Sequence, residues 1–383
     1  MTQTDIYLDY NATTPCDPRV LEAMLPFFSE IYGNPANTLH KQGRLAAKCV
    51  EDARESVAHL VGAHPGEIIF TAGATESNNL AILGIARGAA STRRKRIVTS
   101  AVEHKSVLSV LGKLESEGFE VIILPVDDRG RVQVGSVEQA INGETLLVSI
   151  QGANNEVGTI QPVREIAEIA HRHDALVHCD AAQAVGKIVV HVEDWGVDFA
   201  SVSAHKLYGP KGIGALYMRG GPKSVPIEPI LVGGGQERGL RPGTLNVPAI
   251  IGFGEACRVC SQQVGEESAR LASLRDYFES RLQDEVPGIR INGDTTHRLP
   301  NTSSVTFPAV DADALLLSIP GVMLGTGAAC TSGAIAPSHV LEAMGLCRED
   351  AFRTVRASIG RFTDAEQLEL AVKAIAEAHR SLL

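Results

Sequence analysis

The stretch SVSAHKLYGPKG (residues 201–212) decides how the rest of the chain is read. It ends an apolar, β-branched run and places Ser203, His205 and Lys206 within four residues of one another. Glycine and proline follow at once, and these residues end a strand and favour a turn. A lysine at such a point is usually a solvated charge. Alternatively, Lys206 is the residue around which a functional site is built. The polar residues that follow the other predicted strands decide between these two interpretations.

Short apolar runs recur along the first two thirds of the chain and predict buried strands. They cover residues 67–70, 96–100, 120–126, 145–150, 175–180, 199–203 and 214–218. Helical periods lie between several of them, for example at 76–89 and 162–174. Strands that alternate with helices in this way predict an α/β fold with a mainly parallel seven-stranded sheet, covered on both faces.

The pattern changes from about Ser261 onward. A long polar helical segment covers residues 266–286, and strands are predicted near Arg290, Ser304 and Val322 before a terminal amphipathic helix from Thr363. We interpret this part as a smaller α+β domain. The predicted domains are therefore a large one over residues 16–260 and a small one formed by residues 1–15 and 261–383.

Composition restricts the classes of protein that remain. The 383 residues are 44% hydrophobic and 21% charged, which excludes a disordered chain, and the net charge of −10 argues against direct nucleic-acid binding. No segment has the run of apolar residues needed for a membrane span or a secretory leader, so a cytoplasmic protein is expected. The seven scattered cysteines do not suggest a disulfide framework, and Cys257 and Cys260 fit helix packing better than a metal site. No metal is expected.

Polar residues follow the predicted strands, where open α/β sheets bind ligands. TAGATESNN (residues 71–79) opens a helix with small residues, a layout that can hold an anion such as phosphate. His104 follows the next strand, and Asp180 and Lys206 follow two later ones. Each has an ordinary explanation alone, as a helix cap, an ion pair or a surface charge. Together they match what pyridoxal phosphate needs: an anion cradle, a carboxylate for its ring nitrogen and a lysine for its aldehyde.

At these residues the chain resembles the cysteine desulfurases of the NifS/IscS group, within the class V aminotransferase-like pyridoxal-phosphate enzymes of fold type I. The resemblance runs from Tyr7 to about Phe362. It is carried by motifs in a fixed order: LDYNATTP, GNPANTLHKQGR, FTAGATESNNLAI, EHKSVL, NNEVGTIQPV, HCDAAQAVGK, SVSAHKLYGPKGIGALY, GGGQERGLRPGT and TGAACTSG.

The resemblance implies a role for each matching residue. Lys206 would hold the cofactor covalently, Asp180 would pair with its ring nitrogen, Gln183 would donate to its ring oxygen, and His104 would stack on the ring and move protons. The implied phosphate ligands are Thr75, Ser203, His205 and, from the neighbouring subunit of a homodimer, Thr244. The implied ligands of the substrate carboxylate are Asn34, Asn155, which also belongs to the cofactor site, and Arg356.

Cys330 is expected to carry the sulfur. It lies in GTGAACTSGAIAPSH (residues 325–339), where small residues offer little packing, so we expect a mobile loop. In the implied reaction L-cysteine becomes L-alanine, and the Cys330 thiolate takes the substrate sulfur as a persulfide. An ordinary thiol has a pKa of about 8.5, so a base or a positive field must help to form the thiolate, and His104 is one candidate.

The chain departs from the family pattern at two places. Gly325, Thr326, Gly327 and Ala328 stand where the family's loop often has serines, but the loop length matches the group that donates sulfur directly to acceptors. The sequence also ends soon after the last helix, whereas housekeeping members carry a tail that docks an iron–sulfur scaffold. The resemblance implies a sulfur-acceptor protein as partner, either an iron–sulfur scaffold or a thiolation enzyme. The missing tail argues against the usual scaffold and favours a specialised acceptor, one that serves nitrogenase clusters, tRNA thiolation or DNA phosphorothioation.

Two other classes of protein remain open at this point. An aminotransferase or a selenocysteine lyase would keep Lys206 and Asp180, but ordinary transamination would not need Cys330. A non-catalytic adaptor that kept only the fold would be expected to lose Lys206 or Arg356, and this chain has both.

Overall fold

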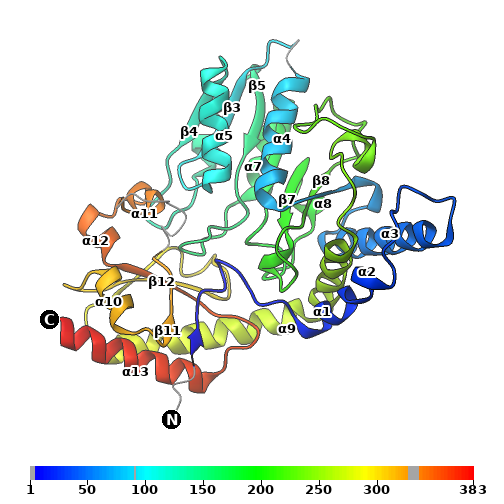
Figure 1. Ribbon diagram of the computed structural model, residues 1–383. Helices are drawn as coiled ribbons and strands as arrows, with labels where there is room; N and C mark the ends of the chain where they lie inside the picture. The colour runs from blue at the N-terminus through cyan, green and yellow to red at the C-terminus, as the bar shows by residue number, and fades with distance from the viewer. Residues whose placement is uncertain (1–4, 90–91, 327–335) are drawn as a thin grey trace.

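The computed structural model describes residues 5–89, 92–326 and 336–383, and its centre is a seven-stranded sheet (Figure 1). The strands lie in the order β2-β8-β7-β6-β5-β3-β4, and only β8 runs antiparallel to its neighbours. Their bounds are Ile68–Thr71 (β2), Arg96–Ser100 (β3), Glu120–Leu124 (β4), Thr145–Ser149 (β5), Leu176–Asp180 (β6), Phe199–Ser203 (β7) and Gly214–Met218 (β8). The predicted α/β fold with a mainly parallel sheet is confirmed.

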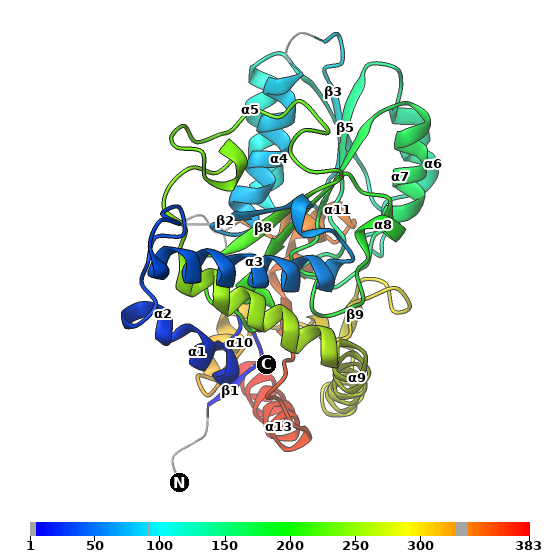
Figure 2. The same cartoon turned by 90° about the vertical axis from the view of Figure 1, so that its right-hand side faces the viewer.

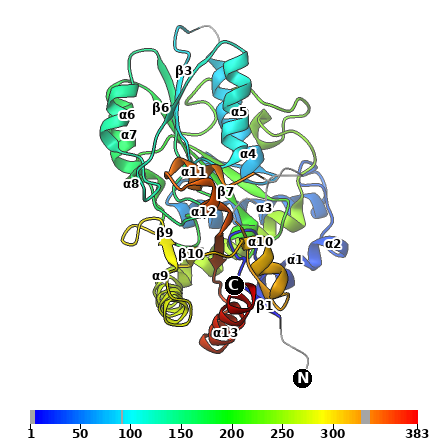
Figure 3. The ribbon, with the colours of Figure 1, turned by 90° about the vertical axis from the view of Figure 1, so that its left-hand side faces the viewer.

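Helices cover both faces of this sheet because successive strand residues point to opposite sides. Ile69, Leu147 and Phe199 face one layer, which contains α4 (Ala74–Gly88) and α5 (Lys105–Ser116). Phe70, Val148 and Ala200, the next residue in each strand, face the other layer. That layer contains α3 (Lys41–Val61), α6 (Val134–Ala140), α7 (Val163–Arg172) and the first part of α9 (Val247–Glu285). Figure 3 shows α6 and α7 on one side of the strands and α4 and α5 on the other.

Short helical segments complete this part of the chain. They are α1 (Pro18–Met24), α2 (Pro26–Ser29), α8 (Val192–Trp195) and the 3₁₀ turns η1 (Pro65–Glu67), η2 (Ala204–Lys206) and η3 (Gln236–Gly239). Turn η2 follows β7 directly, so residues 201–212 form the end of a strand, one tight helical turn and the segment that leads to the return strand β8.

A second hydrophobic core lies below the large sheet (Figure 1). Its three-stranded antiparallel sheet has the order β12-β10-β9, and β1 pairs with β11 in a parallel ribbon. The strands are β1 (Ile6–Tyr7), β9 (Arg290–Asn292), β10 (Thr302–Thr306), β11 (Val322–Met323) and β12 (Thr354–Ser358). The helices are α10 (Ala312–Ser318), α11 (His339–Ala343), α12 (Arg348–Phe352) and α13 (Ala365–Leu382).

Helix α9 joins the two cores. Its first half packs beside α3 (Figure 2), and buried Phe253 belongs to the core of the large sheet. Its second half packs against α13, and Phe278 belongs to the second core. The predicted boundary at 260/261 therefore falls inside one continuous helix of 39 residues. We propose that the two cores correspond to the predicted domains, with α9 shared between them. Among the described helices, none combines the length and hydropathy needed to cross a bilayer.

Candidate active site

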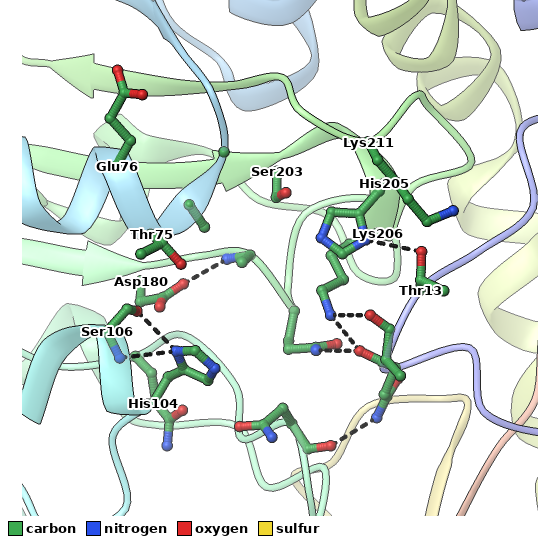
Figure 4. Close-up of a pocket in the computed structure, with 18 of the residues that line it drawn as sticks. Thr13, Thr75, Glu76, His104, Ser106, Asp180, Ser203, His205, Lys206 and Lys211 are labelled. Atoms are coloured by element: carbon green, nitrogen blue, oxygen red, sulfur yellow. Dashed lines mark hydrogen bonds between the residues drawn. The ribbon is translucent and has the colours of Figure 1, made fainter. Parts of the chain in front are cut away.

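A cavity of about 870 Å³ lies at the carboxyl ends of the parallel strands. Figure 4 shows Thr75, His104 and Asp180 on one side of it and His205, Lys206 and Lys211 on the other. The sheet brings these residues together because β2, β3, β6 and β7 all run toward the same edge. The predicted site residues that line the cavity are Thr75, His104, Asn155, Asp180, Gln183, Ser203, His205, Lys206 and Arg356.

One end of the cavity is built to receive an anion. Helix α4 begins after Gly73, whose φ of 147° is open to glycine but rarely to other residues, and no side chain caps this helix end. A Cβ atom on Gly73 would lie 3.7 Å from the Ser203 hydroxyl oxygen, so the missing side chain leaves room beside Ser203. Thr75 in the first turn also lines the cavity. Backbone N–H groups, hydroxyls and the positive end of the helix dipole together suit a phosphate.

Lys206 reaches across the cavity to the N-terminal segment. Its Nζ donates to the main-chain oxygen of Asn11 at 2.5 Å and to that of Ala12 at 2.8 Å. Turn η2 brings the lysine there because the chain must reverse between β7 and β8. The amine is thus held by neutral carbonyl groups.

His205 lies on the same side and is held neutral. Burial, together with the positive charges of Lys206, Lys211 and Lys187, lowers its pKa to about 4. Its Nδ1 lies 3.1 Å from the Thr13 hydroxyl. A neutral imidazole can donate one N–H to an anion without adding a further charge to this side of the cavity.

Asp180 supplies the carboxylate on the opposite side. Its Oδ2 accepts from Asn78 Nδ2 at 2.7 Å, and its Oδ1 accepts from the main-chain N–H of Ala182 at 3.1 Å. Only 7% of the residue is exposed. A buried carboxylate with donors fixed in this way is a defined partner for a protonated ring nitrogen.

His104 is the N-cap of α5, and this position fixes its tautomer. Its Nδ1 accepts from the main-chain N–H of Ser106 at 3.1 Å and lies 2.8 Å from the Ser106 hydroxyl. Because Nδ1 is an acceptor, the ring proton of the neutral histidine sits on Nε2. Nε2 is therefore the atom at which this side chain can give or take a proton.

Arg356 comes from β12 in the second core and lines the cavity although it is only 5% exposed. Its Nη2 donates to Asp9 Oδ1 at 2.6 Å and its Nη1 to the main-chain oxygen of Asn155 at 3.0 Å. Its buried Nε has no hydrogen-bond partner among the described residues. The Arg356 side chain thus forms a buried ion pair with Asp9, and its Nε is a further donor next to the cavity.

These features fit pyridoxal phosphate. The uncapped helix end accommodates its phosphate, Asp180 suits its ring nitrogen and Lys206 suits its aldehyde. Arg356, with an orphaned buried donor, suits the carboxylate of an amino-acid substrate.

Asn11, which the sequence analysis did not single out, connects these parts. Its main-chain oxygen accepts from Lys206 and from Gln183 Nε2, and its side chain bonds Lys187, Thr302 and the main-chain oxygen of residue 155. It is 1% exposed. The available signal was its place in LDYNATTP, one of the motifs that carry the family resemblance. Asn78, the donor to Asp180, lies in FTAGATESNNLAI and was missed in the same way.

Two predicted residues do not reach this cavity within one chain. Asn34 is exposed and lines a separate pocket beside Gln236, and Thr244 is exposed on the segment that follows η3. Their assigned roles stay predictions. Cys330 lies outside the described residues. On either side of that gap, Gly325 pairs with Arg356 through two main-chain hydrogen bonds, and Ser338 donates to Glu156.

The fold and this cavity define the class of protein, and comparison with known proteins agrees. The model of the aminotransferase class-V family matches residues 6–370. A mitochondrial cysteine desulfurase of Arthroderma benhamiae is 48% identical over 97% of this chain and 74% of its own length. A solved NifS-like protein is 40% identical with a TM-score of 0.92, covering 99% of this chain and all of that one. A protein solved as SspA in complex with cysteine is 38% identical with a TM-score of 0.82, covering 94% and 100%.

The chain belongs to the aminotransferase class-V family and, within it, to the cysteine desulfurases. It is a pyridoxal-phosphate-dependent enzyme with the fold type I architecture.

Proposed function

We propose that this cysteine desulfurase binds its cofactor and L-cysteine in the cavity at the carboxyl ends of the strands. The observation that supports it most directly is the convergence of Lys206, Asp180, His104 and Arg356 on one buried cavity. Bound there, pyridoxal phosphate supplies an electron sink conjugated to the amino group of the substrate. Thr75, Ser203 and His205 hold its phosphate, and Lys206 anchors it.

The side chains of the chain bind and orient the substrate. Arg356 donates to the carboxylate through its fork, and Asn155, which lines the same wall, and Asn34 add neutral contacts. The Lys206 amine and His104 Nε2 are the two sites that move protons, because both side chains line the cavity and both carry a nitrogen that can gain or lose a proton. Arg356 is held in place by Asp9 and does not depend on either of them.

Sulfur leaves through Cys330. Its thiolate attacks the substrate sulfur, so an S–S bond forms while the Cβ–S bond of the substrate breaks. The carbon keeps the electron pair of the broken bond and takes a proton. L-Cysteine and the Cys330 thiol thus become L-alanine and a Cys330 persulfide, with no further oxidant or reductant.

The outer sulfur of the persulfide then passes to an acceptor protein. The pathway that this acceptor serves is one of iron–sulfur cluster assembly, tRNA thiolation or DNA phosphorothioation, as the family resemblance implies.

We further propose that the enzyme works as a homodimer in which Thr244 completes the neighbour's phosphate site. Exposed apolar side chains support a contact between copies: Phe28 and Tyr32 are 63% and 70% exposed, and Val232 is 95% exposed. Burying exposed apolar side chains is favourable. Thr244 is exposed too, and it follows Val232 on the segment that surrounds η3.

Anaerobic incubation of the purified holoenzyme with L-cysteine tests the proposal. Alanine release and protein-bound persulfide are measured in the wild type, in Cys330→Ala and in a control, Cys347→Ala, which removes an exposed thiol elsewhere in the chain. We expect both products to depend on Cys330 and not on Cys347. Turnover that survives in Cys330→Ala, or cofactor-dependent alanine formation with no persulfide, would contradict the assigned role and favour a lyase type of reaction. Bound cofactor with no alanine at all would favour a transaminase or another amino-acid substrate.

A further inference from the structure

Lys187 is a second lysine close to the cofactor site to which the proposed reaction gives no role. It follows β6 in the turn that also carries Gln183, and only 6% of it is exposed. Its Nζ donates to Asn11 Oδ1 at 2.8 Å and to Gln183 Oε1. A lysine is almost never buried to this degree without a structural or functional reason.

These contacts determine which way the amide of Gln183 faces. The Lys187 ammonium has N–H donors and no acceptor, so the amide atom that it meets is the oxygen, as its bond to Gln183 Oε1 shows. The nitrogen of the same amide is then turned toward Asn11, and Nε2 donates to the Asn11 main-chain oxygen at 3.0 Å. An amide nitrogen has two hydrogens, so a second donor remains on a side chain that lines the cavity.

We propose that Lys187 is a positioning residue that fixes the orientation of the Gln183 amide, so that its N–H group faces the oxygen on the cofactor ring. Two contacts select this orientation of the amide, and without Lys187 the Asn11 main-chain oxygen remains as the other one. Rotation of the amide by 180° then costs less, and it presents the amide oxygen to the ring oxygen, where two acceptors repel each other. The inference rests on the proposed role of Gln183 as the donor to that oxygen.

The electrostatic setting agrees with this arrangement. Burial, followed by the positive charges of Lys206 and Arg356, lowers the pKa of Lys187 well below its ordinary value. His205, which is neutral, also faces it. Two side-chain oxygens accept from Lys187, those of Asn11 and Gln183, and these hydrogen bonds offset part of the cost of burying its amine beside Lys206 and Arg356.

Absorbance of the holoenzyme provides a readout that does not depend on turnover. The visible band of the bound cofactor is titrated with pH in the wild type, Lys187→Met, Gln183→Ala and the double variant, with Lys373→Met as a control for loss of an exposed lysine. Loss of a donor to the ring oxygen makes that oxygen more basic, so the midpoint rises. We expect a rise of about one pH unit in Lys187→Met and in Gln183→Ala, and no further rise in the double variant.

The combination of variants separates the competing outcomes. An unchanged midpoint in Lys187→Met beside a shifted one in Gln183→Ala would overturn the inference and leave the role of Gln183 intact. An unchanged midpoint in Gln183→Ala would remove the role of Gln183 and the inference with it. Additive shifts in the double variant would show that Lys187 acts through its own charge, which also overturns the proposal.

A second variant keeps the test possible if the first one does not fold. If Lys187→Met gives no folded holoenzyme, Lys187→Gln is titrated in its place, because glutamine is uncharged, polar and too short to reach both acceptors. The same criterion holds: its shift must vanish in the Gln183→Ala background.

Discussion

At the scale of single residues, the site depends on side chains that are held before any ligand arrives. Lys206 is bound to two main-chain oxygens, His104 has its Nδ1 occupied, and Arg356 is fixed by Asp9. Groups held in place in this way lose little conformational entropy on binding, and that is the physical advantage of preorganisation.

Lys206→Ala should abolish the yellow absorbance of the bound cofactor, because the covalent anchor is lost. The measurement is the visible spectrum of the purified variant after incubation with pyridoxal phosphate and treatment with borohydride. Lys211→Ala, which changes another lysine lining the cavity, is the matched control and should keep the band. Reduction of the cofactor onto a lysine other than Lys206 in the variant would disprove the assignment.

Arg356→Lys should raise the KM for L-cysteine by about 10- to 100-fold with a smaller effect on kcat, because lysine keeps the charge but loses the fork. Steady-state alanine formation measures it. Arg353→Lys is the control, since Arg353 lies three residues away and pairs with exposed Glu349 on α12. Equal KM values for the wild type and Arg356→Lys would remove Arg356 from the substrate site.

At the scale of elements, buried polar contacts tie strands and turns to one another. Glu237 in η3 has backbone angles of φ 45° and ψ 46°, and its carboxylate binds both Arg54 of α3 and the main-chain N–H of Phe70 in β2. Neither charged side chain is more than 5% exposed. The pair thus holds the segment that leads to Thr244 against the large sheet.

Glu237→Ala should lower the free energy of unfolding by about 3–5 kcal/mol, because buried Arg54 would lose its buried carboxylate and keep the exposed one of Glu51, and the Phe70 N–H would lose its acceptor. Urea unfolding measures the loss. Glu168→Ala breaks the exposed pair of Arg164 and Glu168, and we expect a change below about 0.5 kcal/mol. A loss in Glu237→Ala no larger than in this control would contradict the role given to the buried pair. An Arg54→Met, Glu237→Met double variant should recover part of the stability.

A buried histidine in the central strands should make the free energy of unfolding depend on pH. His178 of β6 is fully buried between Ser149 of β5 and Ser201 of β7, and burial lowers its pKa to about 4. An unfolded histidine has a pKa of about 6.5, so as pH falls from 6.5 to 4 the unfolded chain binds a proton that the folded one does not. The unfolding free energy should therefore fall by up to about 3 kcal/mol from this residue over that window.

His178→Asn should remove that part of the pH dependence whatever its effect on absolute stability. The measurement is the slope of unfolding free energy against pH between 6.5 and 4, compared with the wild type and with His59→Asn, a change at an exposed histidine. An unaltered slope in His178→Asn would contradict the prediction, because it would mean that His178 takes up its proton at the same pH in the folded and the unfolded chain.

At the scale of the whole molecule, two cores share one site. Asn11 and Arg356 come from the part built around the small sheet, while Lys206 and Asp180 follow strands of the large one. The cavity therefore exists only when both parts are assembled. The proposed homodimer extends the same principle, because Thr244 would complete a site in the neighbouring copy.

Mixing two inactive variants tests the shared site. Lys206→Ala lacks the anchor, and Thr244→Asp places a carboxylate beside the phosphate of the partner. Co-expressed chains should form mixed dimers with one intact site, so desulfurase activity and visible absorbance return to about a quarter of the wild-type value per chain if pairing is random. Each variant alone should stay inactive. If a mixture confirmed to contain mixed dimers stayed inactive, Thr244 would not act across the interface.

The sequence by itself determined the seven strands, the mainly parallel character of their sheet and the set of polar residues at the carboxyl ends of the strands. Residues 96–100, 199–203 and 214–218 are strands with the predicted bounds, because runs of buried apolar residues are local signals. The predicted helix over 266–286 was right in type, but α9 begins at Val247, since its first half is apolar and its second half amphipathic and the two halves serve different cores.

Only the tertiary structure decided which atoms of those residues meet. Gln183 and Lys187 are four residues apart, but Asn11, which bonds both, lies more than 170 residues away. Asp9 and Asn78 also belong to the site through contacts with residues that are distant in the sequence, Arg356 and Asp180 respectively. Hydrogen-bond partners depend on distance in space and on the desolvation of both groups, and neither quantity is encoded in local periodicity. Residue types and strand ends indicated the chemistry, and long-range packing determined its geometry.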